Sequence, residues 1–338
     1  TVLATVATAP TESATCGGRI AWVEDVEGKS EPSACQQVAE EFPEVCGGCA
    51  PFGLPPLPPS PPPGLAVLMM GNSYTYYNGG VNGVLLQLLA ALGDSPRVQA
   101  LTKGGSSLNY HWQEVSSPSS GHHVALASGF DFVVLQDRSD IPSRCCYTDQ
   151  DEDFEASTRA LVQLDAAIKE AGATTVLYQT WGRRGSLNRP PYFQSFLPMN
   201  DAVEEGYRRY ASLITTDGRA PIIAPVGSAF ELVYGADRDL WYRLYDRDAT
   251  HPSALGTYLA AIVVYASITG LSPDGLPSAL GISGAEAELL QGKAAEALAS
   301  QCSSIGDGVP AATPCSQFMF HTLPLTIVHN THMHCLRR

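Results

Sequence analysis

The architecture follows from the stretch Leu65-Ala-Val-Leu-Met-Met-Gly-Asn-Ser-Tyr-Thr75, in which six apolar residues end at a glycine and a polar turn. A short, continuous apolar run is typical of a parallel strand that is buried on both faces. Glycine allows the backbone to turn tightly, which would present Ser73 at the edge of a sheet. Ser73 is then either a nucleophile or simply the cap of the following segment.

Strands and helices alternate along the chain after this run. Further strands are predicted at residues 97–102, 130–135, 174–178 and 221–225, and helices at residues 81–92, 154–171, 201–214, 252–269 and 286–300. Parallel strands joined by helices of this length form a sheet that is covered on both faces. We therefore predict an α/β protein with a doubly wound, parallel five-stranded sheet flanked by helices.

Polar residues follow four of the predicted strands. In a doubly wound sheet, a site forms beyond the carboxyl ends of the strands. The loops that reach this edge begin at Gly71, Gly104, Gln136 and Thr180. These loops, together with one that approaches from the C-terminal part of the domain, are where we expect the chemistry.

The segment Asp248-Ala-Thr-His251 places a carboxylate three residues before an imidazole. An aspartate in this position can hold one ring nitrogen of the histidine while the other ring nitrogen faces a nucleophile. By itself, the pair is better explained as an acidic helix entry with an incidental histidine. Its occurrence after Ser73 and the other polar loops favours a shared site.

The order of these blocks resembles that of the SGNH (GDSL-like) hydrolases, and in particular the branch with Gly-Asn-Ser in place of Gly-Asp-Ser. The first block is similar to Leu68–Thr75, and the last block to Asp248–His251. The glycine of the second block matches Gly105 within Gly104-Gly105-Ser106-Ser107. The resemblance covers roughly residues 65 to 270 and implies a three-layer α/β hydrolase domain.

The resemblance implies acyl transfer through a serine triad. His251 would take the proton from Ser73 as the serine attacks an ester carbonyl, and Asp248 would stabilise the imidazolium. Water would then hydrolyse the acyl-enzyme. This chemistry needs no metal and no organic cofactor.

The resemblance also implies an oxyanion hole, in which the third block departs from the family. The developing charge would meet the backbone N–H groups of Ser73 and Gly105 and one side-chain amide. Where the family often has Gly-x-Asn-Asp, this chain has Gln136-Asp-Arg-Ser139, so Gln136 is expected to replace the asparagine. Asn109 is the alternative donor.

Two aromatic side chains near the predicted site are candidates for substrate binding. His111 follows the second block, and Trp181 follows the fourth strand. Such rings suit sugars or aromatic acyl groups, although both positions are also compatible with ordinary packing. A carbohydrate acetyl esterase is the first expectation, ahead of a lipase, for which a longer apolar lid would be expected. A non-catalytic glycan-binding protein and an acyltransferase are the alternatives.

The composition limits the partners. The chain has 338 residues, 44% of them hydrophobic and only 16% charged, with a net charge of −14. Nucleic-acid backbones and anionic membranes require clustered Lys and Arg, so neither is an expected partner. We expect instead a small-molecule or glycan ester as substrate.

Four of the nine cysteines, Cys16, Cys35, Cys46 and Cys49, lie in the first fifty residues. Their density favours a disulfide-stapled module at residues 1–50, which is typical of oxidising compartments. The spacing of Cys46 and Cys49 would also suit zinc. The chain opens at Thr1 with no basic and apolar leader, as expected for a secreted chain after processing or for a trimmed sequence.

Residues 51–64 contain eight prolines in fourteen positions and are predicted to be a semi-rigid linker. An SH3-type ligand is the alternative function for such a run. The hydrolase domain is expected at residues 65–300 and a mobile tail at residues 301–338. The spacing of His329, His332, His334 and Cys335 in the tail would also suit a transition metal.

Overall fold

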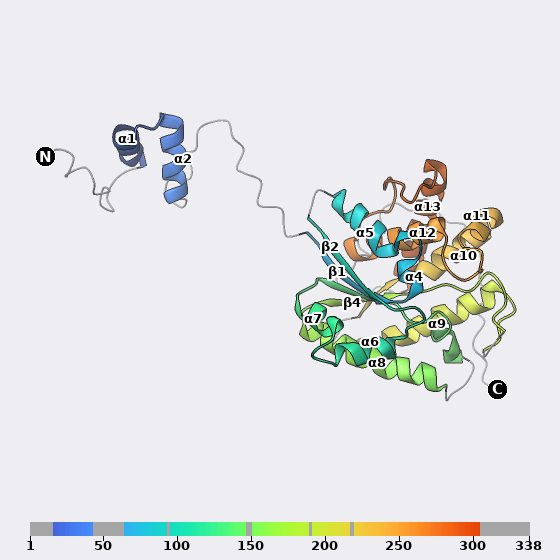
Figure 1. Cartoon of the computed structure of the whole chain (residues 1–338). Coiled ribbons are helices and arrows are strands. Elements are labelled where there is room, and N and C mark those ends of the chain that lie inside the picture. Colours follow the sequence, from blue (N-terminus) through green and yellow to red (C-terminus); the bar gives the residue numbers. More distant parts are fainter. Residues whose placement is uncertain are drawn as a thin grey trace. The chain divides into compact units, whose positions relative to one another are not determined.

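The computed structural model describes residues 16–42, 64–92, 95–146, 151–188, 191–216 and 220–304 (Figure 1). The chain divides into two compact units, Thr1–Pro62 and Pro63–Arg338. The predicted linker up to residue 63, two of the clustered cysteines (Cys46 and Cys49) and the tail beyond residue 304 lie outside the described residues. Within the described ranges, no helix has the length and apolar character needed to cross a membrane.

The second unit is built on a parallel sheet of five strands. They are β1 (Ala66–Gly71), β2 (Arg97–Thr102), β3 (Phe132–Leu135), β4 (Thr174–Tyr178) and β5 (Ile222–Ala224). The strand order is β2-β1-β3-β4-β5, and every neighbouring pair is parallel. The predicted α/β class and five-stranded sheet are therefore confirmed. Because β1 lies inside the sheet, the turn after it emerges between the loops that follow β2 and β3.

Two groups of helices cover the sheet (Figure 1). One face carries α5 (Val81–Ala90), α10 (Val226–Ala236), α12 (Ala254–Thr269) and α13 (Gly284–Ser304), and the other carries α6 (Leu108–Val115), α7 (Gly121–Ala127), α8 (Glu152–Glu170) and α9 (Phe196–Ile214). In β1, Val67 and Met69 pack with the first group, and Leu68 and Met70 with the second. The alternation of side chains in a strand thus divides one apolar run between two cores.

The two cores differ in polarity. Helix α12 is buried at every position from Leu255 to Ile268, because it lies between the sheet and other helices of its group. On the opposite face, buried polar side chains such as His111, Asp137 and Asp165 accompany the apolar ones. These polar groups gather mainly where the strands end, so they bear directly on the site.

Among the described residues of the second unit, five α-helices were not predicted: α4 (Ser73–Tyr76), α6, α7, α10 and α11 (Arg238–Arg243). Helix α10 contains Gly227, which lowers helix propensity. The reason for this glycine is tertiary, since a Cβ there would lie 2.2 Å from the Thr180 carbonyl oxygen. Helix α6 has only eight residues, so the sequence offers few repeats of a helical hydrophobic period.

The first unit contains two helices, α1 (Cys16–Glu27) and α2 (Glu31–Glu41). They share a small core of Val23, Ala34 and Val38. Cys35 lies in α2, but the side chain of Cys16 and all of Cys46 and Cys49 are outside the described part. The disulfide-stapled module therefore stays a prediction, whereas the two helices are an observed feature that the sequence pattern did not indicate.

Candidate active site

Three predicted site residues meet beyond the carboxyl end of β1. Ser73 opens the short helix α4 (Ser73–Tyr76), and its Oγ lies 2.7 Å from Nε2 of His251. Nδ1 of the same imidazole lies 2.5 Å from Oδ2 of Asp248. Residues separated by about 175 positions in the chain thus form one line of hydrogen bonds. In this line, His251 donates through Nδ1 and accepts the serine proton at Nε2.

Asp248 is held by its own loop. Its Oδ1 accepts hydrogen bonds from the backbone N–H groups of Thr250 at 3.0 Å and His251 at 2.9 Å. Partial burial raises the pKa of Asp248. The hydrogen bonds from the His251 ring and from these two N–H groups together lower it by more, so the net shift is downward. The carboxylate is therefore ionised and able to balance a positive charge on the imidazole.

The turn that leads into Ser73 depends on the two residues before it, Gly71 and Asn72. A Cβ at Gly71 would lie 2.4 Å from Oγ1 of Thr75, so only glycine fits. Asn72 adopts an extended conformation, and its Oδ1 caps α4 by accepting from the Tyr74 N–H. Its Nδ2 donates to the Ser106 carbonyl at 2.9 Å. The asparagine thus starts the helix that presents Ser73 and ties it to the loop after β2.

Gln136 lies beneath this turn and is fully buried. Its Oε1 accepts from the Asn72 N–H at 2.8 Å and from Oγ1 of Thr75 at 3.0 Å, while its Nε2 donates to the Asp137 carbonyl. The amide therefore supports the backbone of residues 71–75, which we call the nucleophile turn. Its hydrogen bonds do not correspond to the oxyanion donor expected from the sequence, because the extra methylene lets the amide fold back under the turn.

Two backbone N–H groups are available to an oxyanion. Neither Ser73 nor Gly105 donates its N–H to an acceptor anywhere in the described ranges. Gly105 has φ +69°, a conformation that glycine adopts without strain. Its loop is fixed beside the turn, because the Lys103 N–H and the Ser106 hydroxyl both donate to the Gly71 carbonyl. Asn109, the alternative donor, is partly exposed in the first turn of α6.

The expected contact of His111 with substrate is not what the structure shows, because the side chain has 0% exposure. Its Nε2 lies 3.1 Å from the Gly71 carbonyl, and its Nδ1 lies 3.1 Å from Nε2 of His122. A carbonyl only accepts, so Nε2 of His111 carries the proton and Nδ1 accepts from His122. Burial, followed by the proximity of His122, lowers the pKa of His111 to about 3. This neutral imidazole braces the nucleophile turn from behind.

Trp181 is also buried, with 0% exposure, so the predicted contact of its ring with substrate is likewise not observed. The indole stacks between Tyr74 at 4.6 Å and Phe230 at 4.4 Å, measured between ring centroids. Its Nε1 donates to the Thr250 carbonyl at 3.2 Å. Trp181 therefore connects the residue after the nucleophile with the loop that carries the acid–base pair.

The aromatic residues that contact His251 were missed by the sequence analysis. The Tyr77 ring stacks on the imidazole, with centroids 4.2 Å apart and planes inclined by 12°. Tyr74 meets it edge-on at 5.6 Å, and the Tyr74 hydroxyl lies 2.5 Å from Oγ1 of Thr250. The cluster of tyrosines directly after Ser73 was the available signal, because α4 returns these side chains to the same edge of the sheet.

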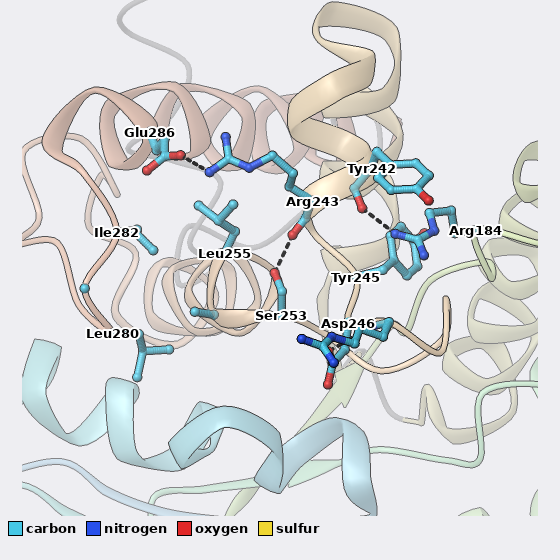
Figure 2. Close-up of a pocket in the computed structure, with 13 residues that line it drawn as sticks. Arg184, Tyr242, Arg243, Tyr245, Asp246, Ser253, Leu255, Leu280, Ile282 and Glu286 are labelled. Carbon is cyan, nitrogen blue, oxygen red and sulfur yellow. Dashed lines mark hydrogen bonds and ion pairs between the residues drawn. The ribbon is translucent and has the colours of Figure 1, made fainter.

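A cavity of about 630 Å³ lies beside the loop that carries Asp248 and His251 (Figure 2). Asp246, Arg247 and Ser253 from the flanks of this loop line it, whereas the three triad side chains do not. Figure 2 shows Arg243 paired with Glu286 across one side, and Arg184 against Tyr242 on another. The lining is polar and charged near the loop, whereas Leu255, Leu280 and Ile282 contribute an apolar part.

Metal ligands do not converge near this site. Across the ranges that the structure describes, no three His, Cys, Asp or Glu side chains are grouped so that they could hold a metal ion. The histidines of the tail lie outside those ranges.

Comparisons with known proteins agree with the observed fold. No protein-family model and no curated protein matches the chain. A DUF4886 family protein from Bacteroides uniformis is similar over 73% of this chain and 98% of its own, with 20% identity and a TM-score of 0.56. A candidate SGNH hydrolase from Slackia heliotrinireducens covers 60% and 98%, with 27% identity and a TM-score of 0.47. A candidate GDSL-like lipase from Parabacteroides merdae covers 62% and 96%, with 17% identity and a TM-score of 0.44.

The five-stranded parallel sheet and its flanking helices give the chain an α/β fold that is similar to that of the DUF4886 family protein. Similarity at this level assigns a fold and no substrate, since unrelated activities share folds. The residues at the carboxyl edge of the sheet carry the argument about function.

Proposed function

We propose that the protein is a serine esterase that hydrolyses carboxylic esters through Ser73, His251 and Asp248. The observation that carries this proposal is the line of hydrogen bonds from Ser73 Oγ through the His251 ring to Asp248, at 2.7 Å and 2.5 Å. A nucleophile, a base and a group that orients the base are the three roles that acyl transfer requires.

The reaction begins when Nε2 of His251 takes the hydroxyl proton of Ser73 as Oγ attacks the ester carbonyl. The N–H groups of Ser73 and Gly105 stabilise the negative charge that develops on the carbonyl oxygen. His251 then protonates the departing alcohol, which leaves an acyl group on Ser73. Water attacks this acyl-enzyme with His251 again acting as base, and the acid and free enzyme are released.

Among esters, we propose an acetyl ester of a carbohydrate. The cavity beside the catalytic loop supports this choice, because Asp246, Arg247 and Ser253 line it near the loop and offer hydrogen-bond partners to a polyhydroxylated alcohol. Tyr77 and Tyr74 enclose the imidazole, which is consistent with a small acyl group near Ser73. The same acyl-enzyme would give an acyltransferase if a second alcohol replaced water.

The test is covalent labelling with a fluorophosphonate, followed by peptide mass spectrometry. An activated serine reacts, and we expect a single adduct on Ser73 in the full chain. The Ser73→Ala variant is the matched control and should remain unlabelled. A wild-type protein that takes up no label and hydrolyses no short-chain acyl ester contradicts the proposal, and the fold would then serve binding.

A further inference from the structure

Arg183 is partly buried, and its side chain has no hydrogen-bond or ion-pair partner among the residues that the structure describes. Within the described ranges, three arginine side chains make no hydrogen bond or ion pair: Arg183, Arg238 and Arg247. The latter two are exposed, whereas Nε of Arg183 is enclosed and unpaired. The terminal nitrogens of Arg183 are not enclosed, so the end of the guanidinium remains accessible.

Other partly buried arginines of this domain are paired. Arg138 and Arg144 both contact the fully buried carboxylate of Asp140, at 2.9 Å each. This pairing is what low polarity demands, because a charge withdrawn from water is unfavourable unless another charge or strong hydrogen bonds compensate it. Arg183 is the exception, and its position explains why.

The backbone of Arg183 is fixed to the catalytic loop. On one side, the Arg184 N–H donates to the Ala249 carbonyl at 3.0 Å. On the other, Trp181 donates through Nε1 to the Thr250 carbonyl at 3.2 Å. Both acceptors lie between the catalytic aspartate and histidine, so Arg183 occupies the edge of the site, beyond the carboxyl end of β4.

The positive charge of Arg183 lowers the pKa of the Tyr74 hydroxyl, which belongs to the residue after the nucleophile. Burial raises the pKa of the Tyr74 hydroxyl, and hydrogen bonds with Ser139 and Thr250 oppose this shift. The positive charge of Arg183 opposes it as well. Tyr74 directly follows Ser73 in the chain, so the charge of Arg183 acts on the residue next to the nucleophile.

We propose that Arg183 binds a carboxylate on the alcohol portion of the ester, so that the enzyme selects acetyl esters of acidic sugars or similar carboxylate-bearing alcohols. A guanidinium fork matches a carboxylate through two parallel hydrogen bonds. An acetyl group carries no ionisable group, so the carboxylate must belong to the alcohol portion of the ester. In a chain of net charge −14, such a substrate needs a local cation at the site. This inference rests on the proposed esterase activity.

Kinetics with two probes test the preference. We would compare 4-acetoxybenzoate, which carries the carboxylate, with neutral phenyl acetate, in the wild type and in Arg183→Gln. A charge-assisted hydrogen bond corresponds to about a 10- to 100-fold effect. We expect kcat/KM for 4-acetoxybenzoate to fall by that factor, mainly through KM, and the value for phenyl acetate to change less than about threefold.

Two further variants make the result specific. Arg183→Lys keeps the charge but loses the fork, so it should recover part of the preference. Arg208→Gln removes an exposed arginine that pairs with Glu204 and Glu205 on α9, and it should leave both probes unaffected. An equal loss on both probes, or no loss on either, overturns the inference while the esterase stands.

Binding without turnover separates the two proposals. In Ser73→Ala, titration calorimetry should give tighter binding of 4-acetoxybenzoate than of phenyl acetate, and the difference should vanish in Ser73→Ala/Arg183→Gln. A charge-dependent difference in a protein that hydrolyses neither ester would retain the role of Arg183 and reject the esterase. Equal binding of both probes would reject the role of Arg183.

Discussion

The nucleophile turn and the acid–base loop are built in opposite ways. Around Ser73, the supporting side chains are buried, with exposures of 3% for Asn72 and 0% for Gln136 and His111. In the loop, the side chain of His251 is 23% exposed and that of Asp248 is 43% exposed. One half of the site is embedded in a polar network under the sheet edge, and the other half lies at the surface.

The difference indicates how each half keeps its geometry. The turn cannot shift without breaking several buried hydrogen bonds, each of which is costly to leave unmade. The loop is held by aromatic contacts and a few hydrogen bonds, such as the stacking of Tyr77 on His251 and the bond from Asn78 Nδ2 to the Pro252 carbonyl at 2.6 Å. We therefore expect changes in the loop to affect turnover, and changes under the turn to affect turnover and folding together.

The largest effect is expected where the two halves meet. Ser73→Ala and His251→Ala should each lower kcat by about 10⁴–10⁶, because the two residues act as a unit. For the same reason, the double variant should be scarcely worse than either single variant. Initial rates on a soluble acetyl ester measure this, with circular dichroism as the check on folding. Wild-type turnover by folded Ser73→Ala would rule out this nucleophile.

A smaller loss is expected from the exposed carboxylate of the loop. Asp248→Asn removes the negative charge that balances the imidazolium and changes the favoured tautomer, so kcat should fall by about 10²–10⁴. The thermal midpoint should hardly change, because asparagine keeps the Oδ1 that accepts from the Thr250 and His251 N–H groups. Loss of folding in this variant would mean that the loop is as structural as the turn, and the comparison would fail.

Under the turn, His111→Phe should affect both folding and activity. It removes the donor to the Gly71 carbonyl and leaves Nε2 of His122 unpaired in the core, so the free energy of unfolding should drop by about 1–3 kcal/mol. We expect kcat to fall about tenfold with KM nearly constant. His123→Phe, an exposed neighbour on α7, is the matched control and should stay within about 0.5 kcal/mol. If both variants lost the same free energy of unfolding and the same kcat, the buried His111 would be no more important to the turn than an exposed histidine.

The smallest effect on turnover is expected at Asp137, a fully buried carboxylate next to Gln136. Burial raises its pKa to about 6, against hydrogen bonds from Tyr210 and the Leu108 and Arg138 N–H groups that lower it. Because the pKa in the folded state exceeds the unfolded value, its contribution to stability is fully present below about pH 4 and is lost as the pH rises through 6.

Asp137→Asn cannot ionise, so it should lose this pH dependence. Relative to the wild type, the variant should gain on the order of 3 kcal/mol between pH 4 and pH 7, with turnover within about threefold. Urea unfolding at several pH values gives the measurement. Parallel pH profiles for the two proteins would show that Asp137 does not ionise in this range.

The sequence by itself determined the sheet and the residues that meet at its edge. Each predicted strand formed at the predicted place, with ends shifted by no more than two residues. In β1, β3 and β4 the reason is that an apolar run without alternation suits a strand that is buried on both faces. Ser73 could be named in advance, since parallel strands bring the polar residues that follow them to one edge, whereas Asp248 and His251 were named from their spacing and from the order of the blocks.

Only the tertiary structure decided what the other polar and aromatic residues contact. His111, Trp181 and Gln136 follow strands just as Ser73 does, yet all three turn inward to support the site. Gln136 contacts an N–H group 64 positions earlier in the chain, and no local period encodes such a pairing. Periodicity reports which positions are apolar, whereas the partner of a buried polar group depends on which distant atoms the packed chain brings within about 3 Å.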